Sequence, residues 1–180
     1  MNPRAYGLLA VAICLAVTGC TPVSADLARE PSNAHYYDAR LGCAFDYPDD
    51  WTRTPADGAL ILDSPDSKAH IRVSASSQDP VYEEESMKRF DALAHIEEET
   101  LTMQPVSCDA SARVGGFWAT DVVYVAEEVL SGAGRGKRKG RQVLVYAGGT
   151  VYDLDLVARV EAFDAANADF NVLIGSFRVK

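Results

Sequence analysis

The stretch Cys43-Ala44-Phe45-Asp46-Tyr47-Pro48-Asp49-Asp50-Trp51 indicates the fold class of the chain. Apolar or aromatic side chains occupy alternate positions in its first half, and a period of two is typical of a β-strand with one buried face. A proline and two aspartates then interrupt the pattern, as they do at turns. The tryptophan that follows is expected to close one end of a hydrophobic core. We therefore predict a first strand, its exit turn and an aromatic anchor.

Further strand signals recur along the chain. The longest apolar segment, 117–129, has valine and aromatic residues on both of its faces, which indicates a sheet covered on both sides. Near the end of the chain, Gly148-Gly149 separates two alternating segments and is a strong hairpin signal. Strands are predicted over residues 59–63, 70–75, 117–129, 142–147 and 150–158.

Two segments have helical periodicity instead. The first begins at Asp79-Pro80, an N-cap followed by a proline in the first turn, and is predicted to end at Pro105. The second covers 161–175, with apolar residues at helical spacing, and a short terminal segment over 176–179 follows it. Together these elements predict an α+β fold, in which an antiparallel β-sheet is covered by helices on both faces.

The N-terminus has the organisation of a bacterial lipoprotein signal. Arg4 gives a short positive region, residues 7–16 form an apolar core, and Val17-Thr18-Gly19-Cys20 resembles the lipobox. In signals of that kind the cysteine thiol receives a diacylglyceryl group, and the chain is cut before it. We therefore expect a signal peptide over 1–19 and attachment to a lipid bilayer through Cys20. The alternative is a plain secretory signal with a chance cysteine.

Composition divides the remainder of the chain into a tether and one domain. Residues 20–40 are rich in proline, serine, alanine and asparagine without a clear period, which is typical of a tether. The remaining residues, 41–180, have room for a single well-buried domain, since 48% of the whole chain is hydrophobic. The expected location is the bacterial cell envelope, on the extracytoplasmic side. Thr21 is not the aspartate that retains lipoproteins at the inner membrane, which favours the outer membrane in a Gram-negative envelope.

Several short motifs are similar to those of the PsbP-like family, named after an extrinsic subunit of photosystem II. They are Phe45-x-Tyr47-Pro48-x-x-Trp51, the hairpin tyrosines Tyr146 and Tyr152, and the closing Ile174-Gly175-Ser176-Phe177. The resemblance implies an α/β/α sandwich over 41–180, a fold shared with a nuclear-transport factor that binds the Ran GTPase. It also implies a non-catalytic accessory or binding role without an active site. Metal and photosystem contacts of the plant protein do not map onto this chain, and a fold does not imply a function.

Two of the four cysteines remain after processing, since Cys14 leaves with the signal peptide and Cys20 carries lipid. In an oxidising envelope, an even remainder predicts one disulfide, between Cys43 and Cys108. Two separate buried thiols are the alternative. A catalytic cysteine is a remote option, because no motif places a histidine beside either residue.

The segment Ser131 to Arg141 is the main candidate for a binding site. It is rich in glycine, and we expect a flexible hairpin tip. It fails as a phosphate loop because Gly136-Lys137 is followed by arginine rather than serine or threonine. A basic tip on an acidic protein predicts contact with an acidic partner or an anionic headgroup, while a solvated, aggregation-resistant tip is the alternative. Its five basic residues are Arg135, Lys137, Arg138, Lys139 and Arg141.

Other chemistry has no pattern to support it. His35, His70 and His95 lack a zinc-binding spacing, no G-x-S-x-G elbow occurs, and the acidic groups do not follow a calcium loop. We therefore expect no metal, no cofactor and no catalytic residue. The net charge of −9 also argues against nucleic acid as a partner, because counterion displacement needs a basic surface.

The sequence thus predicts a lipoprotein that acts as a non-catalytic binding or assembly factor with an unidentified envelope protein. Two alternatives remain open. One is an enzyme of unrecognised type. The other is a small-ligand binder with an aromatic pocket between sheet and helix, for which the available aromatics are Trp51, Trp118, Tyr124, Tyr146 and Tyr152.

Overall fold

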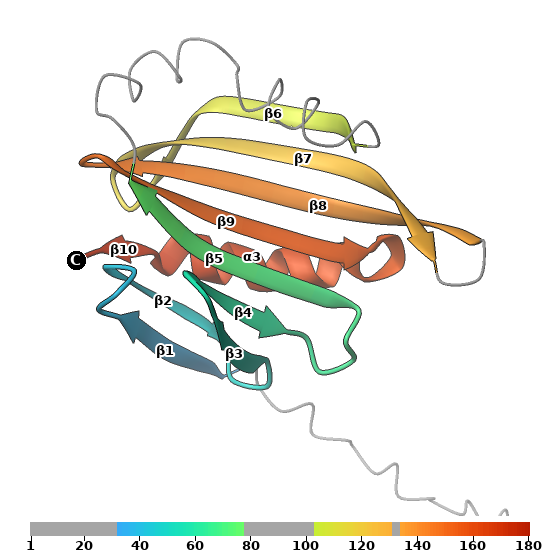
Figure 1. Ribbon diagram of the computed structural model, residues 1–180, viewed down its shortest axis with the longest axis horizontal. Coiled ribbons are helices and arrows are strands. Elements are labelled where there is room, and N and C mark those ends of the chain that lie inside the picture. Colours follow the sequence, from blue (N-terminus) through green and yellow to red (C-terminus); the bar gives the residue numbers. More distant parts are fainter. Residues whose placement is uncertain (1–31, 78–102, 131–133) are drawn as a thin grey trace, which may run out of the picture. The chain divides into compact units, whose positions relative to one another are not determined.

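The computed structural model describes residues 32–77, 103–130 and 134–180. These residues lie in one compact unit, Pro31–Lys180. Within them, ten strands form two antiparallel sheets, and one α-helix follows the last long strand (Figure 1). None of the described helices is long and apolar enough to cross a membrane.

The smaller sheet contains the stretch that indicates the fold. It has the order β1-β2-β10, formed by β1 (Asn33–Asp38), β2 (Cys43–Pro48) and β10 (Arg178–Val179). Cys43, Phe45 and Tyr47 all belong to the hydrophobic core, as their alternation predicts. Trp51 is buried after the turn, so its predicted role as an aromatic anchor is confirmed.

The larger sheet has seven strands in the order β3-β4-β5-β9-β8-β7-β6, and every pairing is antiparallel. The predicted hairpin at Gly148-Gly149 is confirmed, and its φ angles of 59° and 83° lie in the left-handed region that glycine tolerates. The strands are β3 (Thr52–Ala56), β4 (Ala59–Asp63), β5 (Ala69–Ser77), β6 (Met103–Val114), β7 (Phe117–Leu130), β8 (Gly134–Ala147) and β9 (Thr150–Arg159).

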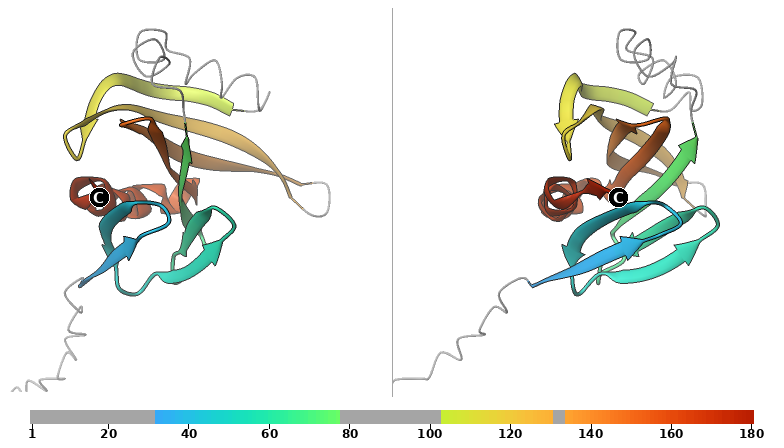
Figure 2. Two further views of the ribbon diagram at one scale, coloured as in Figure 1. Left: turned by 60° about the vertical axis from the view of Figure 1, so that its left-hand side comes forward. Right: turned by 90° about the vertical axis from the view of Figure 1, so that its left-hand side faces the viewer.

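After a short 3₁₀ turn, η1 (Val160–Ala162), helix α3 (Phe163–Ser176) packs on the inner side of the curved large sheet. The small sheet lies on the same side (Figure 2). The buried residues of α3 recur every three or four positions, which confirms the predicted helical stripe. They are Phe163, Ala166, Phe170 and Leu173.

Polar contacts and ring stacking fix α3 to the small sheet. Trp51 Nε1 donates to Asp169 Oδ2 on the helix at 3.1 Å. The amide of Asp46 donates to Ser176 Oγ at 2.8 Å. Phe45 stacks on Phe177 with ring centroids 6.5 Å apart and an interplanar angle of 13°. The end of the helix therefore completes the core around β2.

Three sequence predictions about the fold need correction. Helices on both faces are not observed in the described ranges: α3 covers one face, and the small sheet beside it was not predicted. Most of the first predicted helix lies outside the described residues, but its last part, Met103–Pro105, belongs to strand β6. The predicted tether also extends too far, because β1 pairs with β2 over residues 33–38. Strand pairing explains the last two corrections: β6 pairs with β7 and β1 pairs with β2, and these pairings override the pattern read from the local sequence.

Candidate partner-binding surface

The basic stretch predicted as a loop is mostly a strand. β8 begins at Gly134 and pairs with β7 on one side and, from Arg138 onward, with β9 on the other. The prediction of a flexible tip is therefore wrong for residues 134–141, while 131–133 lie outside the described residues. Pairing with β7 along its whole length, and with β9 from Arg138, satisfies backbone groups of this segment and outweighs the low strand propensity of its glycines.

The strand divides the basic side chains between two faces of the sheet. Lys139 and Arg141 lie on the face that carries α3, and alternation places Lys137 with them and Arg138 on the opposite face. The backbone of Arg135 belongs to the same strand. The five residues therefore do not form one continuous docking patch.

Arg141 is occupied by contacts inside the protein. Its Nε and Nη2 donate to the two carboxylate oxygens of Asp121 at 2.9 and 2.6 Å. Its Nη1 donates to Asn167 Oδ1 at 2.9 Å and to Asn171 Oδ1 at 2.7 Å, both on α3. The guanidinium lies 5.7 Å from the ring centroid of Phe170. Arg141 therefore links the sheet to the helix and has few donors left for a partner.

The remaining members of the stretch differ in how accessible they are. Lys139 is half-buried, with Nζ 4.2 Å from the ring centroid of Phe163. Arg138 is half-buried as well, and Lys137 is exposed across from Glu127 on β7. An acidic residue opposite Lys137 reduces the positive potential at this end of the sheet.

A different surface feature lies at the β6–β7 turn. Trp118 is 40% exposed, unusual for so large an apolar side chain. The guanidinium carbon of Arg113 lies 3.4 Å above the centre of its ring. The two residues are cross-strand neighbours, since Gly115-Gly116 forms the turn between their strands. Their symmetric positions about two glycines are the sequence signal that predicts this contact.

The aromatic residues named for a ligand pocket do not share one site. Trp51 and Tyr152 belong to the core on the inner side of the large sheet. Trp118 and Tyr146 are paired cross-strand neighbours on the outer face, and Tyr124 lies on that face too. The five aromatics therefore do not line a single pocket between sheet and helix.

One buried pair on the outer face has perturbed acidity. Tyr124 Oη donates to Asp155 Oδ1 at 3.0 Å, directly over Gly140. Burial raises the pKa of Asp155 to about 6, and the charge of Asp153 adds to this, while the Tyr124 hydrogen bond opposes it. Burial also raises the pKa of Tyr124, followed by the charge of Asp155. Both members of this pair therefore have a raised pKa and favour their protonated forms.

Cys43 and Cys108 are both free thiols in the structure. Cys43 belongs to the core between the two sheets, while Cys108 lies on β6 opposite Val122, on the outer side of the large sheet. The predicted disulfide is therefore not formed, because the large sheet lies between the two thiols. Burial raises the pKa of Cys43 to about 12, so its thiol stays protonated and unreactive.

The described residues contain no group of three His, Cys, Asp or Glu side chains that could hold a metal ion. His35 Nδ1 lies 2.7 Å from Asp46 Oδ1, in an exposed cross-strand contact. His70 lies on β5, and His95 is outside the described residues. Cys20 and the rest of the predicted lipoprotein signal are outside them too.

The arrangement of a curved antiparallel sheet around a C-terminal helix is a PsbP-like fold. The solution structure of cyanobacterial PsbP (CyanoP) from Synechocystis sp. PCC 6803 matches with a TM-score of 0.57 at 16% identity, over 91% of this chain and 99% of that one. The Ran-binding protein Mog1p of Saccharomyces cerevisiae matches with a TM-score of 0.56 at 11% identity, over 83% and 96%.

A third similar structure is LpqN of Mycobacterium tuberculosis, described as involved in cell envelope biogenesis. It has a TM-score of 0.54 at 14% identity and covers 85% of this chain and 87% of that one. No protein-family profile matches the chain. No curated protein matches it either. At such identities the similarity establishes the fold, and the function has to be argued from the surface of this chain.

Proposed function

We propose that this protein is a lipid-anchored bacterial envelope protein that acts as a non-catalytic accessory factor by binding another protein. The exposed Trp118–Arg113 stack carries the proposal. Tryptophan and arginine are the residue types most enriched among side chains that dominate protein–protein binding energy. The guanidinium of Arg113 stacked on the exposed indole of Trp118 offers a partner protein an apolar surface and a positive charge side by side.

The fold supports a binding role. Among the similar structures, Mog1p is described as Ran-binding, and LpqN as involved in envelope biogenesis. The Ran-binding description of Mog1p supports a role in binding another protein. The aromatic residues available for a small ligand are distributed over both faces of the sheet, which favours a protein partner over a ligand pocket.

Anchoring is supported by the lipobox-like Val17-Thr18-Gly19-Cys20. Each buried acyl methylene contributes about 0.8 kcal/mol to membrane binding, so two or three chains on Cys20 hold the protein on the bilayer durably. Thr21, in place of the aspartate that retains lipoproteins at the inner membrane, supports an outer-membrane location if the envelope is Gram-negative.

The anchor is tested by fractionating cells that express the native chain or Cys20→Ser. We expect the native protein in the membrane fraction with an acylated N-terminal peptide by mass spectrometry. Cys20→Ser should remain unprocessed and lack the acyl mass. A native N-terminus without acyl groups contradicts the anchor.

Binding is tested by co-purification from gently solubilised membranes, comparing the native chain with Trp118→Ala. Trp118→Ala is expected to reduce recovery of a specific partner, because truncating such an anchor costs about 2 kcal/mol or more. Val160→Ala is the control, since Val160 is also exposed, at 48%, but has no cation stacked on it. Equal recovery by all three forms would move the interface away from Trp118.

A further inference from the structure

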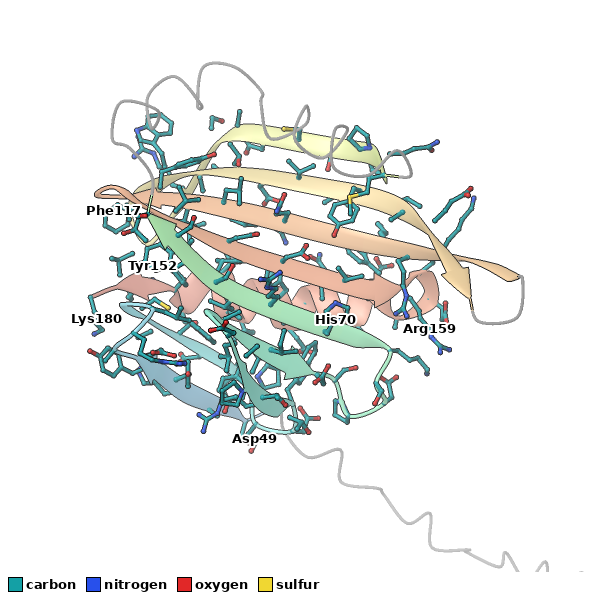
Figure 3. All side chains as sticks on the ribbon, in the orientation of Figure 1. Asp49, His70, Phe117, Tyr152, Arg159 and Lys180 are labelled. Carbon is teal, nitrogen blue, oxygen red and sulfur yellow. The ribbon has the colours of Figure 1, made fainter. Side chains whose placement is uncertain are left out.

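Three cationic side chains gather at the end of the molecule where Trp118 lies. The β6–β7 turn packs against the C-terminal segment so closely that a Cβ added at Gly115 would lie 2.8 Å from the Phe177 carbonyl oxygen and 3.9 Å from Arg178 Cα. Lys180 joins the same end, because its amide donates to Gly42 O at 2.9 Å. Phe117 and Lys180 mark this end in Figure 3, with Arg159 at the other. We call Arg113, Trp118, Arg178 and Lys180 the basic end.

The basic end stands out against the charge of the chain. The chain has a net charge of −9, yet neither segment 110–120 nor segment 170–180 contains an aspartate or a glutamate. Within the described residues, no carboxylate forms an ion pair with Arg113, Arg178 or Lys180. These charges are therefore not neutralised locally.

Nearby acidic groups are already engaged. Asp38, the last residue of β1, is buried and accepts hydrogen bonds from Arg40 Nη2 at 3.1 Å and Tyr36 Oη at 2.9 Å. The Arg40 hydrogen bond holds the pKa of Asp38 at about 2, so Asp38 and Arg40 cancel each other. The basic end keeps its positive potential.

Contacts within the protein place two of the three cations, Arg113 and Arg178. Arg113 is placed by its stack on Trp118 and by a hydrogen bond from Nη1 to Gly116 O at 3.4 Å. Arg178 Nη1 donates to the Phe177 carbonyl at 2.6 Å and to the Gly175 carbonyl at 3.2 Å. Pre-placed cations lose less side-chain entropy on binding than free ones do.

We propose that the basic end is the docking surface for an acidic protein segment, one in which carboxylates flank an apolar or aromatic side chain. The carboxylates pair with Arg113 and Arg178, and the apolar group packs on the exposed indole. This inference deepens the proposed function by assigning the chemistry of its partner. The exposed indole beside the cations supports a protein segment over lipid headgroups, because a protein segment can supply carboxylates and an apolar side chain at one place.

The test places a photo-crosslinking benzophenone amino acid at position 118 of the full-length, membrane-anchored chain in intact cells. We expect a protein adduct whose crosslinked peptide carries a net negative charge. Arg113→Glu/Arg178→Glu should lower the yield about tenfold or more, because like charges across an interface oppose binding. The neutral pair Arg113→Gln/Arg178→Gln should give an intermediate loss, and it covers the case in which charge reversal disturbs folding.

The matched control is Lys137→Glu/Arg159→Glu, which makes the same change in net charge at the opposite end of the sheet. Its yield should stay within about twofold of the native yield. The inference is overturned by adducts with lipid, by adducts with neutral or basic peptides, or by equal losses in both double variants. An absent adduct at 118 also overturns it.

Placing the same crosslinker at Val106, 61% exposed on β6, separates this inference from the proposed function. A protein adduct at 106 without one at 118 leaves a partner-binding protein whose surface lies on β6. No protein adduct at either position contradicts both the inference and the proposed function.

Discussion

Arg141 of β8 and Asp121 of β7 form a bidentate ion pair, with nitrogen–oxygen distances of 2.9 and 2.6 Å. Both side chains are largely buried, at 16% and 21% exposure. The same guanidinium reaches Asn167 and Asn171 on α3. A single arginine thus joins two strands to the helix that covers them.

Replacing Arg141 with alanine should lower the free energy of unfolding by about 2–3 kcal/mol, because it leaves the Asp121 carboxylate buried without a partner. Arg141→Lys should recover part of this loss, since lysine keeps the charge but not the planar fork. Urea denaturation followed by near-UV circular dichroism measures both. The control is Lys137→Ala, an exposed position on the same strand, which should change stability by less than about 0.5 kcal/mol. Equal effects of the two alanine variants would contradict the assigned role of Arg141.

Replacing glycine with alanine should have opposite effects on stability at Gly140 and at Gly175. A Cβ at Gly140 would overlap the Tyr124 ring, including a distance of 2.6 Å to Cε2, whereas a Cβ at Gly175 meets nothing within 4 Å. The Tyr124 ring cannot move away cheaply because it is buried and bonded to Asp155. Gly140→Ala should therefore destabilise the protein by about 1–3 kcal/mol. Gly175→Ala, inside α3, should be neutral or stabilising by up to about 1 kcal/mol.

Thermal unfolding of the two variants under identical conditions measures this difference. Gly140→Ala should lower the free energy of unfolding less in a Tyr124→Leu background than in the native chain, because the overlapping ring is gone. If the stability loss of the double variant equals the sum of the two single losses, the effect of Gly140→Ala does not come from overlap with the Tyr124 ring.

The raised pKa of Asp155 makes a contribution to the stability of the fold that should decrease as pH rises. Its folded-state pKa of about 6 lies above the ordinary value of 3.8, so the native state binds the proton more tightly than the unfolded state. This contribution is present in full below pH 3.8 and is lost as pH rises towards about 6. Asp155→Asn keeps an oxygen acceptor for Tyr124 without the charge. It should stabilise the protein by about 1–2 kcal/mol at neutral pH, with little effect in acid.

Urea midpoints measured across this pH range test the prediction, and the native and Asp155→Asn curves should converge on acidification. Asp38 provides an internal contrast. Its pKa is lowered to about 2, so it stabilises the fold above pH 3.8 and this contribution is lost as pH falls towards 2. A pH-independent gap between the native chain and Asp155→Asn would rule out titration of Asp155 as the cause.

Local sequence patterns predicted the parts of the fold that depend on local signals. The alternation Cys43, Phe45, Tyr47 identified β2, the Gly148-Gly149 pair identified the β8–β9 hairpin, and the periodicity of 161–175 identified α3. Each of these depends on residues adjacent in the chain or one helical turn apart, where pattern and structure share the same physical cause.

The missed elements depend on distant partners. Thr52–Ala56 contains a proline, and Met103–Val114 contains Pro105, yet both are edge strands, the sheet position that tolerates proline. Gly134–Arg141 lacks strand propensity and forms a strand because it pairs with β7 throughout and with β9 from Arg138 onward. The basic end combines a turn with the C-terminal segment, a juxtaposition that spacing along the sequence does not predict.

The state of the cysteines gives a final prediction. With Cys43 and Cys108 as free thiols, a chain that is processed and lipidated as proposed should show two thiols that react with Ellman's reagent in denaturant, without any reductant. In the folded protein both should react slowly. Burial raises the pKa of Cys43 to about 12, and burial followed by the charge of Asp109 raises that of Cys108. Cys108 is only half-buried and should react first.

The single variants Cys43→Ser and Cys108→Ser assign the two rates. Cys108→Ser should remove the faster native-state phase, and Cys43→Ser only the phase that appears on unfolding. Thiols that become reactive only after reduction would establish a disulfide. Because the large sheet separates Cys43 from Cys108, such a bond requires either a different packing of β2 and β6 or a link between two molecules through Cys108. The mass of the unreduced protein distinguishes a monomer from a linked dimer.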